Sequence, residues 1–326
     1  MASRTFSTRS DPLLLLLLTA WLTGCAVLPA PPDQAGALEL DTVPFFPQED
    51  YQCGPAALAT VLVHSGIDTS AQALVPQVYL PGREGSLQPE LLAAARRAGR
   101  IPWQLEGGME ALFAELAAGN PVLVLQNLGV AALPVWHYAV VIGFEPDSRR
   151  VILRSGRERR REEPWGRFLA SWNRGELWAM VALPPEQLPA SWTDPEALSR
   201  ALASQEASLP KALAVKAWEA ARERWPDAGA PLFGSANAFQ ASGRHAEAAA
   251  RYRSLLQREP EHLGARNNFA NLLLREGCPA AASAVIEPAL AAQPSEPLLS
   301  VIRQTAAEIA QAGTQDASHC GLWVAP

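Results

Sequence analysis

The chain lacks several features that define common classes of protein. It has no glycine-rich phosphate loop, and none of its 5 histidines and 4 cysteines is spaced as in zinc sites. The apolar run from Pro12 to Leu18 is too short to span a bilayer. Acidic residues outnumber basic ones, 33 to 27, which does not favour a nucleic-acid partner. We therefore expect no metal, no cofactor and no nucleic acid.

The first 24 residues have the organisation of a secretory signal, because Arg4 and Arg9 precede the apolar run. The stretch Leu22-Thr23-Gly24-Cys25 that follows resembles the bacterial lipobox, which implies that Cys25 is lipidated and begins the mature chain. The alternative is a buried cysteine in an N-terminal helix. Ala26 stands where an Asp would retain a lipoprotein at the inner membrane, so we expect an outer-membrane anchor that faces the periplasm.

Three cysteines remain in a compartment that permits disulfides: Cys53, Cys278 and Cys320. Sequence alone does not fix which of them pair. A pair between Cys278 and Cys320 would leave Cys53 free, as a nucleophile must be.

With 326 residues, of which 48% are hydrophobic, the chain is long enough for two domains. A proline-containing tether spans residues 25–42. In the first domain, residues 43–188, we predict helices at 55–64, 88–98 and 109–118, followed by strands at 121–126, 138–142 and 151–153. This order indicates an α+β fold. The charged run 157–163 is typical of a solvated loop, or it borders a cleft that selects acidic peptides.

The C-terminal part repeats with a period of 34 residues. Gly243 recurs as Gly277, and Leu256 recurs as Leu290. This period, with small residues where helices cross, resembles the tetratricopeptide repeat. We predict an all-α repeat domain at residues 193–310, with two clear units and one weak one, and a tail at 311–326. The repeats would bind a protein partner or the substrate.

Cys53 is the candidate nucleophile. Pro55 and Gly66 are placed to begin and end a helix that starts directly after the cysteine. At the positive end of the helix dipole a thiol pKa can fall well below its usual value of about 8.5, which favours the reactive thiolate. The alternative is a small buried apolar residue.

His137 is the candidate base, because a Cys–His pair activates a thiol for acyl transfer. We predict a hairpin in which Gly143 pairs with about Arg150, which places His137 opposite Ser155 or Gly156. Ser155 would then orient the imidazole. Asp147 lies at the far end of this hairpin, roughly 16 Å away at about 3.3 Å per residue, and is excluded.

Several motifs in this order resemble the bacteriocin-leader-processing cysteine peptidases. They are Val43-Pro44-Phe45-Phe46-Pro47-Gln48, Cys53-Gly54-Pro55, Gly85-Ser86-Leu87, Gly119-Asn120-Pro121 and His137-Tyr138-Ala139. The resemblance covers residues 43–184 and implies a papain-like fold and cleavage of peptide bonds, characteristically after Gly-Gly. It also implies that Gln48 donates to the oxyanion with the Cys53 backbone N–H. The family's Asp is replaced here by Ser155. The lipid anchor and the repeats suggest a lipoprotein branch of the family.

Three functions follow. The first is a lipid-anchored cysteine peptidase of the cell envelope, in which Cys53 attacks, His137 transfers the proton, Gln48 stabilises the oxyanion and the repeats dock a protein. The second uses the same residues to cut peptidoglycan stem peptides. The third is a non-catalytic peptide-binding scaffold, which the loss of the Asp favours.

Overall fold

The structure, a computed structural model, describes residues 36–48, 52–292 and 295–324. The predicted signal peptide, the lipidation site Cys25 and most of the predicted tether lie outside these ranges. Within the described residues, no helix combines the length and the apolar character needed to cross a membrane.

The first domain is built on an antiparallel sheet with the strand order β2-β7-β3-β4-β5-β6, and β1 adds to β4. The strands are β1 Leu38–Glu39, β2 Ile101–Gln104, β3 Val122–Asn127, β4 Trp136–Glu145, β5 Arg150–Ser155, β6 Glu158–Pro164 and β7 Ala179–Leu183. Strands β3, β4 and β5 correspond to the three predicted ones, although β3 begins at Val122 and not at residue 121. The charged run predicted as a loop is strand β6, so that prediction is wrong. An edge strand is largely solvated, and charged side chains are compatible with it.

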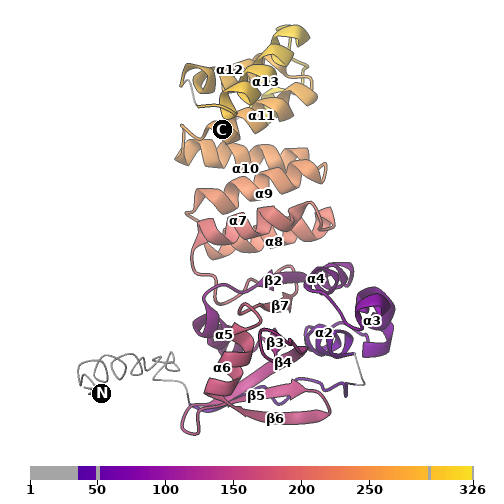
Figure 1. Cartoon of the computed structure of the whole chain (residues 1–326). Coiled ribbons are helices and arrows are strands. Elements are labelled where there is room, and N and C mark those ends of the chain that lie inside the picture. Colours follow the sequence, from indigo (N-terminus) through magenta and orange to yellow (C-terminus); the bar gives the residue numbers. More distant parts are fainter. Residues whose placement is uncertain (1–35, 49–51, 293–294, 325–326) are drawn as a thin grey trace, which may run out of the picture.

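Helices cover both faces of this sheet (Figure 1). Helices α2 Cys53–His64, α3 Ala71–Val78 and α4 Gln88–Arg97, with the 3₁₀ turn Pro81–Arg83, lie on one side, and α5 Gly108–Ala117 and α6 Trp165–Asn173 lie on the other. Successive strand residues point to opposite faces and therefore enter two apolar clusters. Leu123 and Val140 pack in the cluster with α2, whereas Val124 and Val141 pack in the other. The predicted combination of helices and an antiparallel sheet is confirmed.

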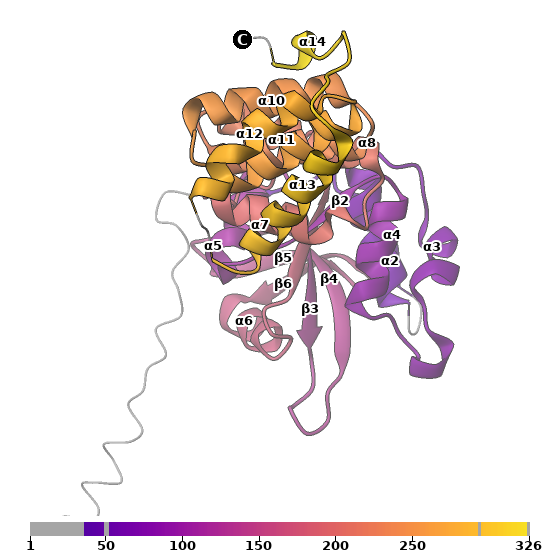
Figure 2. The same cartoon turned by 90° about the horizontal axis from the view of Figure 1, so that it is seen from above.

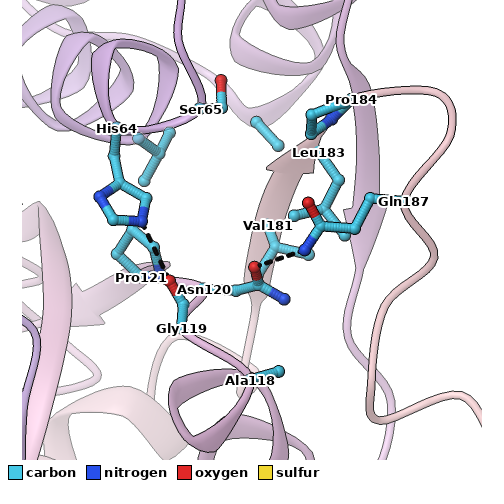
Figure 3. Close-up of a pocket in the computed structure, with 12 residues that line it drawn as sticks. His64, Ser65, Ala118, Gly119, Asn120, Pro121, Val181, Leu183, Pro184 and Gln187 are labelled. Atoms are coloured by element: carbon cyan, nitrogen blue, oxygen red, sulfur yellow. Dashed lines mark hydrogen bonds between the residues drawn. The ribbon is translucent and has the colours of Figure 1, made fainter.

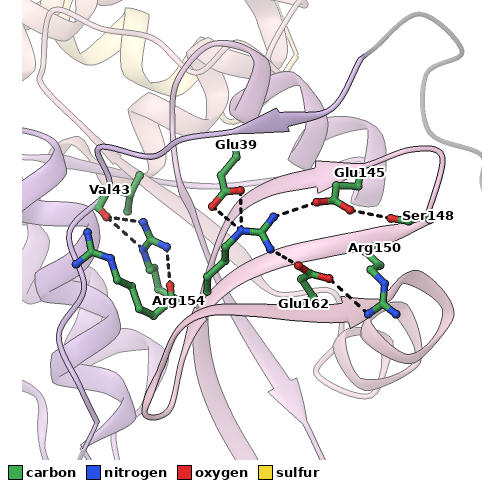
Figure 4. A network of polar contacts seen from close by, with 9 residues as sticks. Glu39, Val43, Glu145, Ser148, Arg150, Arg154 and Glu162 are labelled. Carbon is green, nitrogen blue, oxygen red and sulfur yellow. Dashed lines mark hydrogen bonds and ion pairs between the residues drawn. The ribbon is translucent and has the colours of Figure 1, made fainter.

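Arg160 links β1 to the sheet through three carboxylates, which Figure 4 labels as Glu39, Glu145 and Glu162. Its guanidinium donates to Glu39 of β1, to Glu145 of β4 at 3.0 Å and to Glu162 on its own strand. Nearby, the Arg154 guanidinium donates to the Val43 carbonyl oxygen at 2.9 Å. Together these contacts fix the path of the chain that leads toward Gln48.

The second domain is a stack of helices above the sheet (Figure 1). They are α7 Pro195–Glu206, α8 Lys211–Arg224, α9 Gly229–Ala241, α10 His245–Arg258, α11 Leu263–Arg275, α12 Pro279–Ala291, α13 Leu298–Ala312 and the short α14 Gly321–Val324. Three helix pairs, α7–α8, α9–α10 and α11–α12, correspond to the weak unit and the two clear units of the sequence. The all-α expectation is confirmed.

The C-terminal segment is attached to the last repeat. A disulfide joins Cys278 to Cys320, the pairing that the sequence had left open. Asp316 accepts hydrogen bonds from the backbone N–H groups of Ala280 and Ala281, at the start of α12. Of the described cysteines, Cys53 alone is free.

The two domains share one apolar core. The cluster behind the sheet continues through Trp192 into the helical stack, and the Trp103 and Trp192 rings lie 6.4 Å apart. Buried Glu115 of α5 accepts hydrogen bonds from the backbone N–H and the hydroxyl of Ser191, at 2.8 and 2.7 Å. The segment that joins the two domains, residues 184–192, is therefore held to the first domain.

Candidate active site

Cys53 is the first residue of α2, and its side chain lies against β4. Nine of the 12 residues of α2 are buried, which anchors the helix, and Gly66 follows its end with a left-handed φ of +90°. Burial raises the pKa of the Cys53 thiol, and hydrogen bonds from the backbone at Tyr138 and Gly54 lower it by less. The expectation of a lowered pKa is therefore wrong for this state, because desolvation outweighs the backbone dipoles.

His137 lies at the start of β4, and its imidazole contacts β5, the next strand. Its Nε2 and the Ser155 Oγ, at the end of β5, are 2.9 Å apart. Burial, with a smaller contribution from the positive charge of Arg161, lowers the pKa of His137 to about 4. At neutral pH the imidazole is therefore uncharged, and Nε2 is occupied by the serine, so Nδ1 remains to accept a proton.

The predicted partner of His137 is thus confirmed, although the predicted hairpin register is wrong. Glu145 pairs with Arg150, and Gly143 pairs with Ile152 rather than with Arg150. A bulge between Val141 and Gly143 then changes the register by one residue, which the sequence pattern does not reveal. Asp147 lies in the turn between β4 and β5, as expected, away from the imidazole.

Gln48 is held beside the thiol by two hydrogen bonds. Its backbone N–H donates to the Gly156 carbonyl oxygen at 3.0 Å, and its side-chain Nε2 donates to the Tyr138 carbonyl oxygen at 3.3 Å. The side-chain contact is long for a neutral hydrogen bond, so the amide can turn toward a substrate at small cost. Among the described residues, no hydrogen bond joins the Cys53 sulfur to His137.

One cavity brings Gln48, Cys53 and His137 together. A cavity of about 860 Å³ is lined by Gln48, Cys53, His137 and, from the segment before α4, Ser86 and Leu87. A smaller cavity of about 260 Å³, shown in Figure 3, lies elsewhere, at the joint between the domains. It is bounded by His64, Asn120 and Gln187, whose amide donates to Asn120 at 3.0 Å, and no cysteine is among its lining residues.

Comparison with known proteins gives the family of each domain. Residues 40–176 match the model of the Peptidase_C39-like family, and residues 239–303 match that of the tetratricopeptide repeat. The first domain is a C39-like peptidase domain. No curated protein matches the chain.

Three solved structures that resemble the chain each cover less than half of it. One is described as a C39-like peptidase from Bacillus anthracis, with 18% identity, a TM-score of 0.40 and coverage of 46% of this chain and 98% of its own. A double glycine motif protease from an AMS/PCAT transporter, in complex with the leader peptide, has 21% identity, a TM-score of 0.36 and coverage of 46% and 96%. The peptidase domain of Streptococcus ComA has 23% identity and a TM-score of 0.36, and the match covers 44% of this chain and 98% of that one.

The C39-like domain contains one further site residue that sequence reasoning did not assign. A Cβ atom at Gly54 would lie 2.3 Å from the Ser86 Oγ, so only glycine fits beside the nucleophile. The Ser86 Oγ is buried without a hydrogen-bond partner and lies on the cavity wall. The signal was present, because Gly85-Ser86-Leu87 is one of the motifs of the family resemblance, but its spacing from Cys53 does not predict contact.

Apolar side chains line the mouth of the cavity in the C39-like domain. Leu87, Val135 and Trp136 line it and are 36%, 56% and 54% exposed. Val130 and Leu133 extend this exposed apolar surface along the β3–β4 hairpin, which projects from the domain in Figure 2. A group of exposed large apolar residues indicates an interaction surface, because soluble proteins rarely expose contiguous apolar patches that have no function.

Proposed function

We propose that the chain is a lipid-anchored thiol peptidase that cleaves peptide bonds in an envelope protein or peptide. The C39-like domain points to peptidase activity. The observation that carries the assignment to Cys53 and His137 is that both line one cavity with Gln48, while Ser155 holds the far nitrogen of the imidazole.

The chemistry starts from a neutral pair. His137 Nδ1 accepts the thiol proton as the Cys53 sulfur bonds to the peptide carbonyl carbon, and the carbonyl oxygen gains the negative charge. The Gln48 amide and the Cys53 backbone N–H donate to that oxygen; one such donor contributes about 3 kcal/mol. When the C–N bond breaks, His137 returns the proton to the leaving amine. Water then attacks the thioester and regenerates the thiol.

The apolar mouth of the cavity favours a substrate with apolar side chains next to the scissile bond. Burial of one such side chain against Leu87 and Trp136 contributes up to about 1.5–3 kcal/mol to binding. The preference for Gly-Gly before the cleaved bond, which the sequence resemblance implies, is a separate proposal. Peptide libraries that vary the two residues before the cleavage site, and apolar residues further upstream, test both.

The deciding experiment compares Cys53→Ala with the unmodified mature protein. A peptide-based thiol-reactive probe should label the unmodified protein at Cys53 and should not label the variant. Peptide cleavage should be lost in Cys53→Ala and His137→Ala, with the melting temperature unchanged. Full cleavage by Cys53→Ala would remove the nucleophile assignment. Intact peptide binding without any cleavage in the unmodified protein would favour the non-catalytic scaffold, which Ser155 in place of a carboxylate also supports.

A further inference from the structure

The turn that joins β3 to β4 is apolar and exposed. Residues 128–136 read Leu-Gly-Val-Ala-Ala-Leu-Pro-Val-Trp, with no charged, hydroxyl or carboxamide side chain. All except half-buried Gly129 are exposed, and the hairpin projects from the domain in Figure 2. Turns that face water are usually rich in polar residues such as Asn, Asp and Ser. We call residues 128–136 the apolar tip. Its five large side chains, which are 44–75% exposed, are Leu128, Val130, Leu133, Val135 and Trp136.

The backbone of the apolar tip is hydrogen-bonded within the hairpin. The Leu128 N–H donates to the Val135 carbonyl oxygen at 2.8 Å. Val130 and Leu133 each donate to the carbonyl oxygen of the other, at 3.3 and 3.1 Å. Lipid chains offer no hydrogen bonds, so a segment enters a bilayer at low cost only when its own chain pairs its backbone groups. The two arms of the apolar tip meet this requirement.

Asn127 and Arg174 hold the base of the apolar tip. Asn127 Oδ1 accepts from the backbone N–H groups of Gly129 and Val135, at 3.0 and 2.9 Å. The Arg174 guanidinium donates to the Asn127 carbonyl oxygen at 2.8 Å. A Cβ at Gly129 would lie 2.2 Å from the Leu133 carbonyl oxygen, so the two arms pack backbone against backbone. These contacts brace the apolar tip in its exposed position.

The residues at the base suit the level of lipid headgroups. Trp136 combines an apolar ring with one N–H donor, and tryptophan is enriched where hydrocarbon meets water. Arg174 is exposed and bonded to Asn127, the strand partner of Trp136, so it places a positive charge at the same level, which suits anionic headgroups. A surface for another protein normally has a polar rim around its apolar centre. The apolar tip has no polar side chain apart from the Trp136 indole, which favours lipid over a protein partner.

A lipid at Cys25 and the apolar tip can reach the same bilayer. Cys25 lies 11 residues before Gly36, the first described residue. That length of chain spans at most about 36–40 Å when extended. Strand β1 pairs with the end of β4, at Phe144. From Phe144 to Trp136 the strand covers about 26 Å, at about 3.3 Å per residue. The tether is therefore long enough to let the lipid enter a membrane whose surface lies at Trp136.

We propose that the apolar tip inserts into the near leaflet of a lipid bilayer, with Trp136 and Arg174 at the level of the headgroups. Val135 and Trp136 also line the cavity of Cys53, so this orientation opens the cavity at the membrane surface. The partner is the lipid surface itself, and the chain would meet its substrates there. The inference goes beyond the proposed peptidase activity and shares with it only the expectation of a membrane-anchored chain.

The test measures insertion without the lipid anchor and without cleavage. It uses the mature chain from residue 25 onward with Cys25→Ser and Cys53→Ala, in which Leu133→Cys carries the environment-sensitive fluorophore NBD. Vesicles of phosphatidylethanolamine and phosphatidylglycerol in equal amounts should raise the NBD emission about threefold or more, because the label leaves water. A spin label on the lipid acyl chains should quench that emission. The same fluorophore at Val301→Cys, an exposed position of α13, is the control and should not respond.

Partition of the chain without a fluorophore into the same vesicles, measured by sedimentation, then tests the contribution of Leu133. Leu133→Asn should lower the partition coefficient about fivefold, and Leu133→Trp should raise it about threefold. Val301→Asn is the matched control and should have no effect, and all three variants should keep the melting temperature because both positions are exposed.

NBD emission that the acyl-chain spin label does not quench, or equal partition of both Leu133 variants, would overturn the proposal. Unchanged partition of Leu133→Asn with a raised KM for a soluble peptide, measured on the chain that keeps Cys53, would overturn it as well, since the apolar tip would then bind substrate. Partition is measured without the nucleophile, so a failed cleavage assay counts against the proposed peptidase alone.

Discussion

Replacing Ser155 by aspartate would place a carboxylate where a hydroxyl now contacts His137. Burial and the charge of Arg161 hold the pKa of His137 at about 4. A carboxylate within hydrogen-bond distance typically raises the pKa of a partner cation by about 1–3 units, which would bring His137 to between about 5 and 7. Each unit corresponds to about 1.4 kcal/mol in favour of the imidazolium. A thiolate–imidazolium pair then becomes accessible near neutral pH.

The rate of Cys53 alkylation by iodoacetamide as a function of pH measures this change, because only the thiolate reacts. In the unmodified protein the rate should rise only in the alkaline range, since burial raises the pKa of the thiol. Ser155→Asp should add a second rise at lower pH and increase the rate at pH 6 about tenfold or more. Peptide cleavage should stay equal or increase.

Ser155→Asn is the matched control, because asparagine has nearly the same size as aspartate and no charge. Melting temperatures of both variants show whether the buried position tolerates the larger side chain, since Ser155 is only 4% exposed. If both variants are folded and their alkylation profiles coincide, the carboxylate does not act on His137 and the reasoning from charge is refuted.

Gly54→Ala should abolish probe labelling of Cys53, because the added Cβ would lie 2.3 Å from the Ser86 Oγ. The second substitution Ser86→Gly removes this clash and should restore the labelling. If the double variant is not labelled, the contact between Gly54 and Ser86 does not explain the loss. The pKa of His137, about 4, lies below its ordinary value of 6.5, so the folded state resists protonation and loses stability as pH falls from about 6.5 to 4. His137→Gln should therefore flatten the acid decline of the melting temperature, and identical curves would contradict the pKa. Asp147→Asn should leave cleavage unchanged within about twofold, whereas a large loss would place Asp147 in the mechanism. Cys25→Ser should release the protein from membranes on cell fractionation, and firm membrane association of the variant would argue against a lipid anchor.

The sequence predicted three helices and three strands of the first domain, which correspond to α2, α4, α5, β3, β4 and β5, and the meeting of His137 with Ser155. Proline, glycine and apolar runs are local signals, and they mark α2 and β3 to β5 well. The bulge in β4 and the strand character of the charged run could not be predicted, because both depend on pairing between strands. The sequence also predicted a lowered pKa for Cys53, whereas the structure raises it, for a related reason. The helix start is visible in the sequence, whereas the burial that outweighs it comes from distant segments.

The contact between Ser86 and Gly54 was also not predictable, because it joins residues whose proximity depends on how distant segments pack. The 34-residue repeat was visible because it recurs in the sequence itself.

The segment that joins the domains, residues 184–192, limits where either domain can be exchanged for one from another protein. Ser191 and Trp192 belong to the connecting segment in sequence, yet they complete the hydrogen bonding of Glu115 and the packing of Trp103 in the first domain. A chimaera that exchanges the repeats at residue 184 would remove those partners and leave Oε1 of the buried Glu115 carboxylate without the donors from Ser191. A graft that keeps residues 184–192 with their original sheet retains both contacts. Shuffling of such domains, in the laboratory or in evolution, should therefore succeed with crossover points after Trp192 and fail with points before Ser191.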